Sequence, residues 1–247
     1  MHYEVLGQDN PVVLIHHLGG NLNSWRFQIP ELSKYFKVVA YDLRGHGYSE
    51  CPLDGYSLND QTEDLVELAG HLGLPGFHAI GHSIGGSIAL NAAIQYPDIL
   101  DQVVAVAPPI EPTPEARLKE SGLLLKTAKT RGMEAVAEAR RETMPKKITE
   151  NEELWREFKR RYGMTSVSGF EKTVEALTDM PSMIEELPKI RNHVLGIAGD
   201  LDVLSPNLDI MASKIPNFRK LAIPGCGHFP MLENTAEFNR SLFDFFL

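Results

Sequence analysis

The sequence of 247 residues predicts an α/β fold, in which a mostly parallel sheet is flanked by helices. Pro11–His16 is a continuous apolar run, as expected of a strand buried on both faces of a sheet. Leu58–Leu72 carries apolar residues at helical spacing. Strands that alternate with helices pair in parallel through right-handed crossovers. The expected strands cover residues 3–6, 11–16, 36–41, 77–80, 103–107, 193–198 and 219–223.

The pattern changes near Pro108, where the strand-like runs stop until about Leu187. Charged, helix-prone segments replace them, punctuated by Gly132, Pro145 and Gly163. We therefore predict a core of residues 1–107 and 188–247, with residues 108–187 inserted as a helical cap. The expected helices of the cap cover residues 115–130, 133–143, 152–162 and 168–178, and residues 235–247 form a last amphipathic helix.

Composition excludes several classes of partner. The chain has 24 basic and 33 acidic residues, a net charge of −9, which does not favour nucleic-acid binding. Its apolar runs are far shorter than the roughly 20 residues of a membrane span, and Met1–Glu4 begins no signal segment. The two cysteines, Cys51 and Cys226, have no metal-ligand spacing and fit free thiols. We expect a cytoplasmic protein without metal, cofactor, nucleic-acid or membrane partner.

The most informative motif is Gly81–Gly85, which reads G-x-S-x-G. A strand-like run precedes it and a small, apolar, helix-compatible segment follows it, which is the context that this motif requires. On such a sharp turn the hydroxyl of Ser83 is pushed out of the backbone, and the glycines avoid collisions. The motif predicts that Ser83 is a nucleophile at the carboxyl edge of the sheet, with the Ile84 N–H free to bind an oxyanion.

A serine nucleophile needs a neutral imidazole as base and a carboxylate that orients it. Asp200 and Asp202 directly follow the expected strand 193–198, and His228 follows the strand 219–223. Loops at the carboxyl ends of parallel strands share one crevice, so we expect His228 to be the base. Asp202 is favoured as its partner, because Asp200 suits a turn-capping role. His82 is expected to pack beneath the turn.

The loop His16–Asn21 follows the strand 11–16 and contains two glycines, which let the backbone approach a ligand closely. Its Leu18 N–H is the expected second oxyanion donor, paired with that of Ile84. Two preorganised donors of this kind are worth about 3 kcal/mol each in other enzymes.

Several blocks of the sequence together carry a family resemblance: His16–Gly20 with Trp25, Asp42–Ser49, Gly81–Gly86, Gly199 with Asp202, and Gly227–His228. Over nearly its whole length the chain resembles the α/β-hydrolase superfamily, and within it small esterases and 3-oxoadipate enol-lactonases. The resemblance implies an α/β-hydrolase fold and a cap that roofs the site and sets specificity. It also implies that Arg44, His46 and Gly47 brace loops beneath the site. Epoxide hydrolases and haloalkane dehalogenases of this superfamily use a carboxylate where this chain has Ser83.

One departure is His17, where many relatives have glycine; it either stiffens the oxyanion loop or places an imidazole near the acyl pocket. Trp25 either lines the pocket or packs under the cap. Most apolar cap residues are expected to form the cap's own core. The candidate pocket residues are His17, Trp25, Leu124, Trp155 and Phe158.

We therefore expect a serine hydrolase that acts on a small-molecule carboxylic ester or lactone through Ser83, Asp202 and His228. One alternative is an enol-lactonase of aromatic catabolism, which calls for a basic cap residue that binds a dicarboxylate. The other is a ligand receptor on a hydrolase scaffold, which turnover of an ester distinguishes from an enzyme. The candidate basic residues are Lys126, Lys129, Arg131 and Arg140, which otherwise belong to solvated faces.

Overall fold

The computed structural model describes the whole backbone, residues 1–247, and all side chains except those of residues 115–118. Seven strands form one sheet in the order β1-β3-β2-β4-β5-β6-β7. Every neighbouring pair is parallel except β1 and β3, which are antiparallel. The strands are β1 (Tyr3–Leu6), β2 (Pro11–Ile15), β3 (Lys37–Tyr41), β4 (Phe77–His82), β5 (Leu100–Val106), β6 (His193–Gly199) and β7 (Phe218–Ile223).

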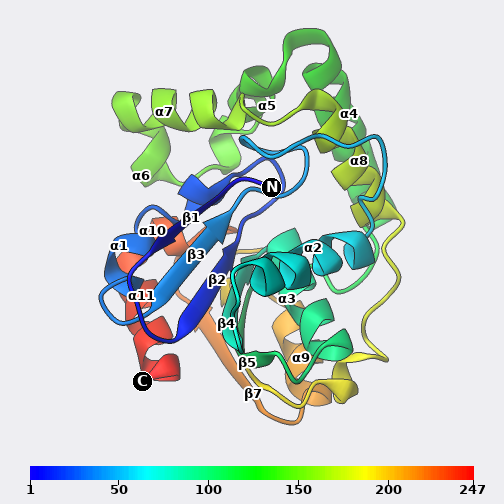
Figure 1. Cartoon of the computed structure of the whole chain (residues 1–247). Helices are drawn as coiled ribbons and strands as arrows, with labels where there is room; N and C mark the ends of the chain where they lie inside the picture. The colour runs from blue at the N-terminus through cyan, green and yellow to red at the C-terminus, as the bar shows by residue number, and fades with distance from the viewer.

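The central strands are mostly apolar because both of their faces are buried. Val12 and Leu14 of β2 face one core, which also contains Phe238 of the last helix, whereas Val13 and Ile15 face the other. Helices α2 (Leu58–His71), α3 (Ile84–Gln95) and α9 (Asn207–Lys214) cover the second face, and α1 (Ile29–Leu32) and α11 (Thr235–Phe246) cover the first (Figure 1). The expected α/β architecture is confirmed, with β1 as its exposed edge.

Helices α4–α8 follow β5 in the chain and precede β6, and they lie over one end of the sheet (Figure 1). The helix expected over 133–143 is interrupted: α5 ends at Ala139, and a 3-10 turn and the short α6 follow it. Pro145, which caps α6, cannot continue a helix from the preceding turn. The cap helices are α4 (Glu115–Arg131), α5 (Met133–Ala139), α6 (Lys146–Thr149), α7 (Glu152–Tyr162) and α8 (Val167–Thr178).

Some elements differ from the expectation. Strand β5 begins three residues earlier than expected, because the buried Leu100 pairs with Phe77 of β4 while the polar residue after it faces solvent. The helix α9 was not expected, and its signal is short: Leu208 and Met211, three residues apart, are its buried side chains. In the described part of the chain, no helix combines the length and apolar character needed to cross a membrane.

Candidate active site

Ser83 lies at the junction of β4 and α3, in a backbone conformation that non-glycine residues rarely adopt. Its φ is +55° and its ψ is −122°, and this strained geometry is held because the Ser83 N–H donates to the Val106 carbonyl of β5 at 2.8 Å. A Cβ on Gly81 would lie 2.0 Å from the Gly85 carbonyl oxygen, and one on Gly85 would lie 2.3 Å from that of Ile15. Only glycine fits at both positions, and strain of this kind is concentrated at functional sites.

His228 follows β7 and Asp202 follows β6, and the two side chains meet at the edge of the sheet. The Nδ1–H of His228 donates to Oδ2 of Asp202 at 2.8 Å. The Asp202 side chain is only 2% exposed, and its Oδ1 accepts the Leu204 N–H at 3.1 Å. A buried carboxylate on Nδ1 fixes the tautomer of the imidazole and leaves Nε2 as the basic nitrogen.

The two candidate carboxylates have different roles. Oδ1 of Asp200 accepts the Gly225 N–H at 2.8 Å, which closes the turn after β7. Asp202 is therefore the carboxylate that the structure brings to His228, and Asp200 has the turn-capping role. The loops of the two strands pass very close, because a Cβ on Gly199 would lie 2.1 Å from the Cys226 carbonyl oxygen.

His82 lies beneath the turn, as expected, and contacts the candidate base. Its Nε2–H donates to the backbone carbonyl of His228 at 2.7 Å, and the two ring centroids are 4.8 Å apart. Burial holds the pKa of His82 well below its ordinary value, with further lowering by the His228 and His17 charges. His82 is therefore a neutral donor whose buried Nδ1 has no partner among the described residues.

The oxyanion loop turns at Leu18 and Gly19, where the Gly20 N–H donates to the His17 carbonyl at 2.9 Å. Gly19 has a φ of +77°, which favours glycine. Within the described residues, the N–H groups of Leu18 and Ile84 have no hydrogen-bond acceptor. Each thus meets one requirement of the expected oxyanion donors, a backbone N–H without an internal acceptor.

His17 stiffens this loop and also lines a cavity. Its Nδ1–H donates to the Leu18 carbonyl at 2.9 Å, and its Nε2 lies 3.4 Å from Oγ of Ser24. Burial lowers the pKa of His17 to about 3, so its imidazole is neutral near pH 7. Of the two roles expected for His17, bracing the loop is the one that these contacts support most directly.

The block Asp42–Ser49 braces the oxyanion loop from below. Oδ1 of Asp42 accepts the Leu22 N–H at 2.7 Å and Oδ2 accepts the Tyr48 N–H at 2.9 Å. His16 connects the same parts, because its Nε2 accepts the Leu43 N–H at 2.9 Å and its Nδ1–H donates to the His17 carbonyl at 2.8 Å. These bonds join the loops after β2 and β3.

The cap holds the oxyanion loop from above. A Cβ on Gly19 would lie 2.2 Å from Cζ of Tyr162, so the phenol of α7 lies directly on the loop backbone. The Thr165 hydroxyl donates to the Gly19 carbonyl at 3.3 Å, and Nδ2 of Asn21 donates to the Arg161 carbonyl at 3.2 Å. The loop is therefore fixed by both layers of the protein.

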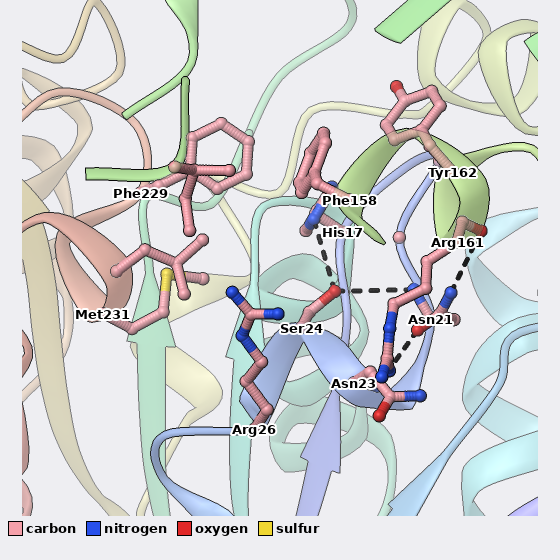
Figure 2. A pocket seen from close by; sticks show the side chains of 14 residues that line it. His17, Asn21, Asn23, Ser24, Arg26, Phe158, Arg161, Tyr162, Phe229 and Met231 are labelled. Carbon is pink, nitrogen blue, oxygen red and sulfur yellow. Dashed lines mark hydrogen bonds between the residues drawn. The ribbon is translucent and has the colours of Figure 1, made fainter. Parts of the chain in front are cut away.

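A small cavity of about 30 Å³ lies between the oxyanion loop, α7 and the segment after His228 (Figure 2). Of the five candidate pocket residues, His17 and Phe158 line it. Sequence reasoning missed its other members, although Phe229 directly follows the candidate base. They are Gly19, Gly20, Asn21, Asn23, Ser24, Arg26, Ile148, Arg161, Tyr162, Phe229, Met231 and Leu232.

Trp25, Leu124 and Trp155 do not line this cavity, and their place in a substrate pocket stays a prediction. Trp25 is fully buried, with its ring centroid 6.4 Å from that of Phe238. Trp155 is 1% exposed and belongs to the same core as Leu14 of β2. Leu124 packs against this core. A large apolar side chain on a helix has the same sequence pattern whether it enters a core or a pocket.

Within the described residues, no three His, Cys, Asp or Glu side chains cluster closely enough to hold a metal ion. The structure joins His228 to Asp202, and the neighbour of Ser83 in the chain, His82, donates to the His228 backbone carbonyl.

Comparison with known proteins places this geometry in a family. The family model described as the alpha/beta hydrolase fold matches residues 10–235. A putative carbamate hydrolase RutD of Pantoea ananatis is 38% identical over 43% of this chain, but that match spans only 40% of the relative's length. The chain thus spans well under half of the length of the first curated relatives that it matches.

Solved structures match over nearly the whole chain. The enol-lactonase of Burkholderia xenovorans LB400 has a TM-score of 0.89 at 25% identity, over 99% of this chain and 95% of its own. A structure from work on carboxylesterases of Nitrososphaera gargenis has a TM-score of 0.89 at 29% identity, over 99% and 93%. From its fold and its family match, this chain belongs to the α/β-hydrolase fold family.

Proposed function

We propose that this chain is a serine hydrolase that cleaves a carboxylic ester or lactone through an acyl-enzyme on Ser83. The observation that carries the proposal is the 2.8 Å bond from His228 Nδ1 to the buried Asp202, beside the strained turn that presents Ser83. This bond leaves Nε2 of His228 free to take a proton. A hydroxyl so placed is the weak nucleophile that a neutral imidazole activates.

In the proposed reaction, Ser83 Oγ attacks the substrate carbonyl while His228 takes its proton. The tetrahedral oxyanion accepts hydrogen bonds from the N–H groups of Leu18 and Ile84. Collapse of this intermediate expels the alcohol, which receives the proton from His228. His228 then activates water, which releases the acid and restores the Ser83 hydroxyl. Asp202 stays ionised and stabilises the imidazolium in both halves of the reaction.

The solved relatives named as carboxylesterases and as an enol-lactonase favour an ester or lactone. A carbamate is a second candidate, because a relative 38% identical over part of the chain is named a putative carbamate hydrolase. The two differ in their leaving groups but share the carbonyl attack. Side-by-side turnover of p-nitrophenyl butyrate and of a carbamate with the same alkyl length distinguishes them.

The test of the serine mechanism combines kinetics with labelling. Purified protein should hydrolyse p-nitrophenyl butyrate, and Ser83→Ala should reduce kcat by about 10⁶, as in other serine triads. A fluorophosphonate should label Ser83, located by peptide mass spectrometry. Ser87 is the control: its hydroxyl donates to the Pro109 carbonyl at 2.6 Å, so Ser87→Ala should retain turnover. Labelling elsewhere with Ser83 unmodified would overturn the proposal, and a folded protein that binds esters without turnover would be a receptor.

A further inference from the structure

The loop that carries His228 contains two glycines, Gly225 and Gly227, and leads directly into the short helix α10 (Pro230–Glu233). Gly225 has a φ of +70°, a conformation that favours glycine. Because glycine restricts the backbone less than any other residue, this loop has little stiffness of its own. The imidazole of His228 is also 25% exposed, so packing surrounds it only in part. Other bonds are needed to hold the base in place.

The carboxylate of Glu233 binds the backbone on both sides of His228. Its Oε2 accepts the Gly227 N–H at 2.8 Å, and its Oε1 accepts the Phe229 N–H at 2.9 Å. Hydrogen bonds to a carboxylate are shorter than those between neutral groups and about twice as strong. One side chain thus fixes the backbone segment from Gly227 to Phe229, and the base lies at the centre of that segment.

Buried side chains support this arrangement from two directions. The carbonyl of His228 accepts the Nε2–H of His82 at 2.7 Å, and His82 is fully buried. The helix α10, which carries Glu233, is itself anchored, because Nε2 of the fully buried Gln28 donates to the Met231 carbonyl at 3.1 Å. Glu233 therefore holds the base loop from a fixed position.

Capping of α10 alone would explain only half of this arrangement. The Phe229 N–H lies at the start of that helix, where backbone donors need an external acceptor. The Gly227 N–H lies outside the helix and on the far side of His228. The next glutamate in the chain, Glu237, pairs with Arg240 instead. The second bond therefore indicates a role in the loop of the base.

We propose that Glu233 is a positioning residue: by binding the N–H groups on both sides of His228, it holds the imidazole where Nε2 takes the proton of Ser83. The proposal rests on the proposed function. A displacement of about 1 Å at a reacting group can cost about 100-fold in rate, so loss of both bonds should lower kcat. Binding of the substrate does not require proton transfer, so KM should change little.

The first test compares variants at two glutamates. Glu233→Ala should reduce kcat for p-nitrophenyl butyrate by about 10- to 100-fold, with little change in KM. Glu233→Gln keeps the shape and one acceptor oxygen, so it should lose less than Glu233→Ala does. Glu237→Gln is the matched control, because Glu237 is also half-buried and pairs with Arg240. It should retain the wild-type kcat.

The same change in a His228→Ala background distinguishes positioning from a general loss of structure. If Glu233 acts through His228, adding Glu233→Ala to His228→Ala should not lower the residual rate further, because residues that act as a unit are not additive. A general structural defect would lower the rate by the same factor in both backgrounds. Circular dichroism checks that each variant is folded.

The proton resonance of the His228 Nδ1–H gives a readout that needs no turnover. In the wild type its bond to the buried Asp202 should protect this proton from exchange and shift its resonance far downfield, and His228→Ala identifies the signal by its loss. In Glu233→Ala the resonance should broaden or disappear, because the imidazole is no longer held against Asp202.

The outcomes separate this proposal from the proposed function. If the wild type hydrolyses no ester, the proposed function fails, whereas the resonance still decides whether Glu233 positions His228. If Glu233→Ala does not fold, the kcat and the resonance of Glu233→Gln decide it. A folded Glu233 variant with the wild-type kcat or an unchanged resonance overturns the proposal, and so does an equal loss in both backgrounds.

Discussion

Acidification from pH 7 to pH 5 should destabilise the fold through the buried imidazoles beneath the site. Burial lowers the pKa of His17 to about 3 and that of His46 to about 4. It also holds those of His16 and His82 well below the ordinary value. In the unfolded chain each histidine titrates near 6.5. Below that pH the unfolded state therefore binds more protons than the native state. The free energy of unfolding must then decrease as the pH is lowered.

The magnitude follows from these values. At pH 5 the unfolded forms of His17 and His46 are protonated while the native forms are still neutral. A pH of 5 lies about 1.5 units below 6.5, and each unit is worth about 1.36 kcal/mol. Each group therefore lowers the free energy of unfolding by about 2 kcal/mol. The two together remove about 4 kcal/mol, and His16 and His82 act in the same direction. This is a large part of the 5–15 kcal/mol of a typical domain.

Urea unfolding at pH 5, 6 and 7 measures this effect, with fluorescence of the buried Trp25 and Trp155 as the signal. His46→Gln removes one titrating group and should reduce the loss between pH 7 and pH 5 by about 2 kcal/mol. His193 is exposed, and His193→Gln is the matched control that should leave the loss unchanged. Equal free energies of unfolding at pH 7 and pH 5 would refute the reasoning, because they require imidazoles that are protonated in the native state.

Further predictions concern single side chains. Asp202→Asn should reduce kcat/KM by about 10⁴, as in a serine protease, whereas Asp200→Asn should cost less than tenfold; similar losses in ester assays would mean that the wrong carboxylate was chosen. His82→Phe removes the donor to the His228 carbonyl and should lower kcat with little change in KM, with partial recovery in His82→Gln. Gly85→Ala should not fold to the native state and should show no cooperative thermal unfolding, because the added Cβ would lie 2.3 Å from the Ile15 carbonyl oxygen. Phe158→Ala should shift kcat/KM among acyl chain lengths while acetate turnover persists; equal losses for all esters would show that α7 positions the site itself.

The sequence predicted the fold because a strand buried on both faces is a continuous apolar run, as Pro11–Ile15 is. It also predicted where Ser83 and His228 lie, because both follow strands and are flanked by glycines. The choice between Asp200 and Asp202 had a weaker basis, since both follow the same strand. Only the structure distinguishes them, because Asp202 accepts a hydrogen bond from His228 whereas Asp200 accepts one from the Gly225 N–H.

The pocket was less predictable for a physical reason. Trp25, Trp155 and Phe158 are all apolar and near the site, yet Phe158 alone of the three lines the cavity. Local sequence specifies that a side chain is buried, but the packing of distant helices decides which space it fills. Tyr162 was missed for the same reason, because its contact with Gly19 joins positions 143 residues apart (162 − 19).

The contacts that fix the oxyanion loop from above have a consequence for how substrate enters. Tyr162, Thr165 and the Arg161 carbonyl all hold the loop that carries the Leu18 N–H. Any displacement of α7 that widens the entrance also removes these contacts from the loop. In the proposed mechanism, the position of α7 therefore controls both the access of substrate and the position of the Leu18 N–H.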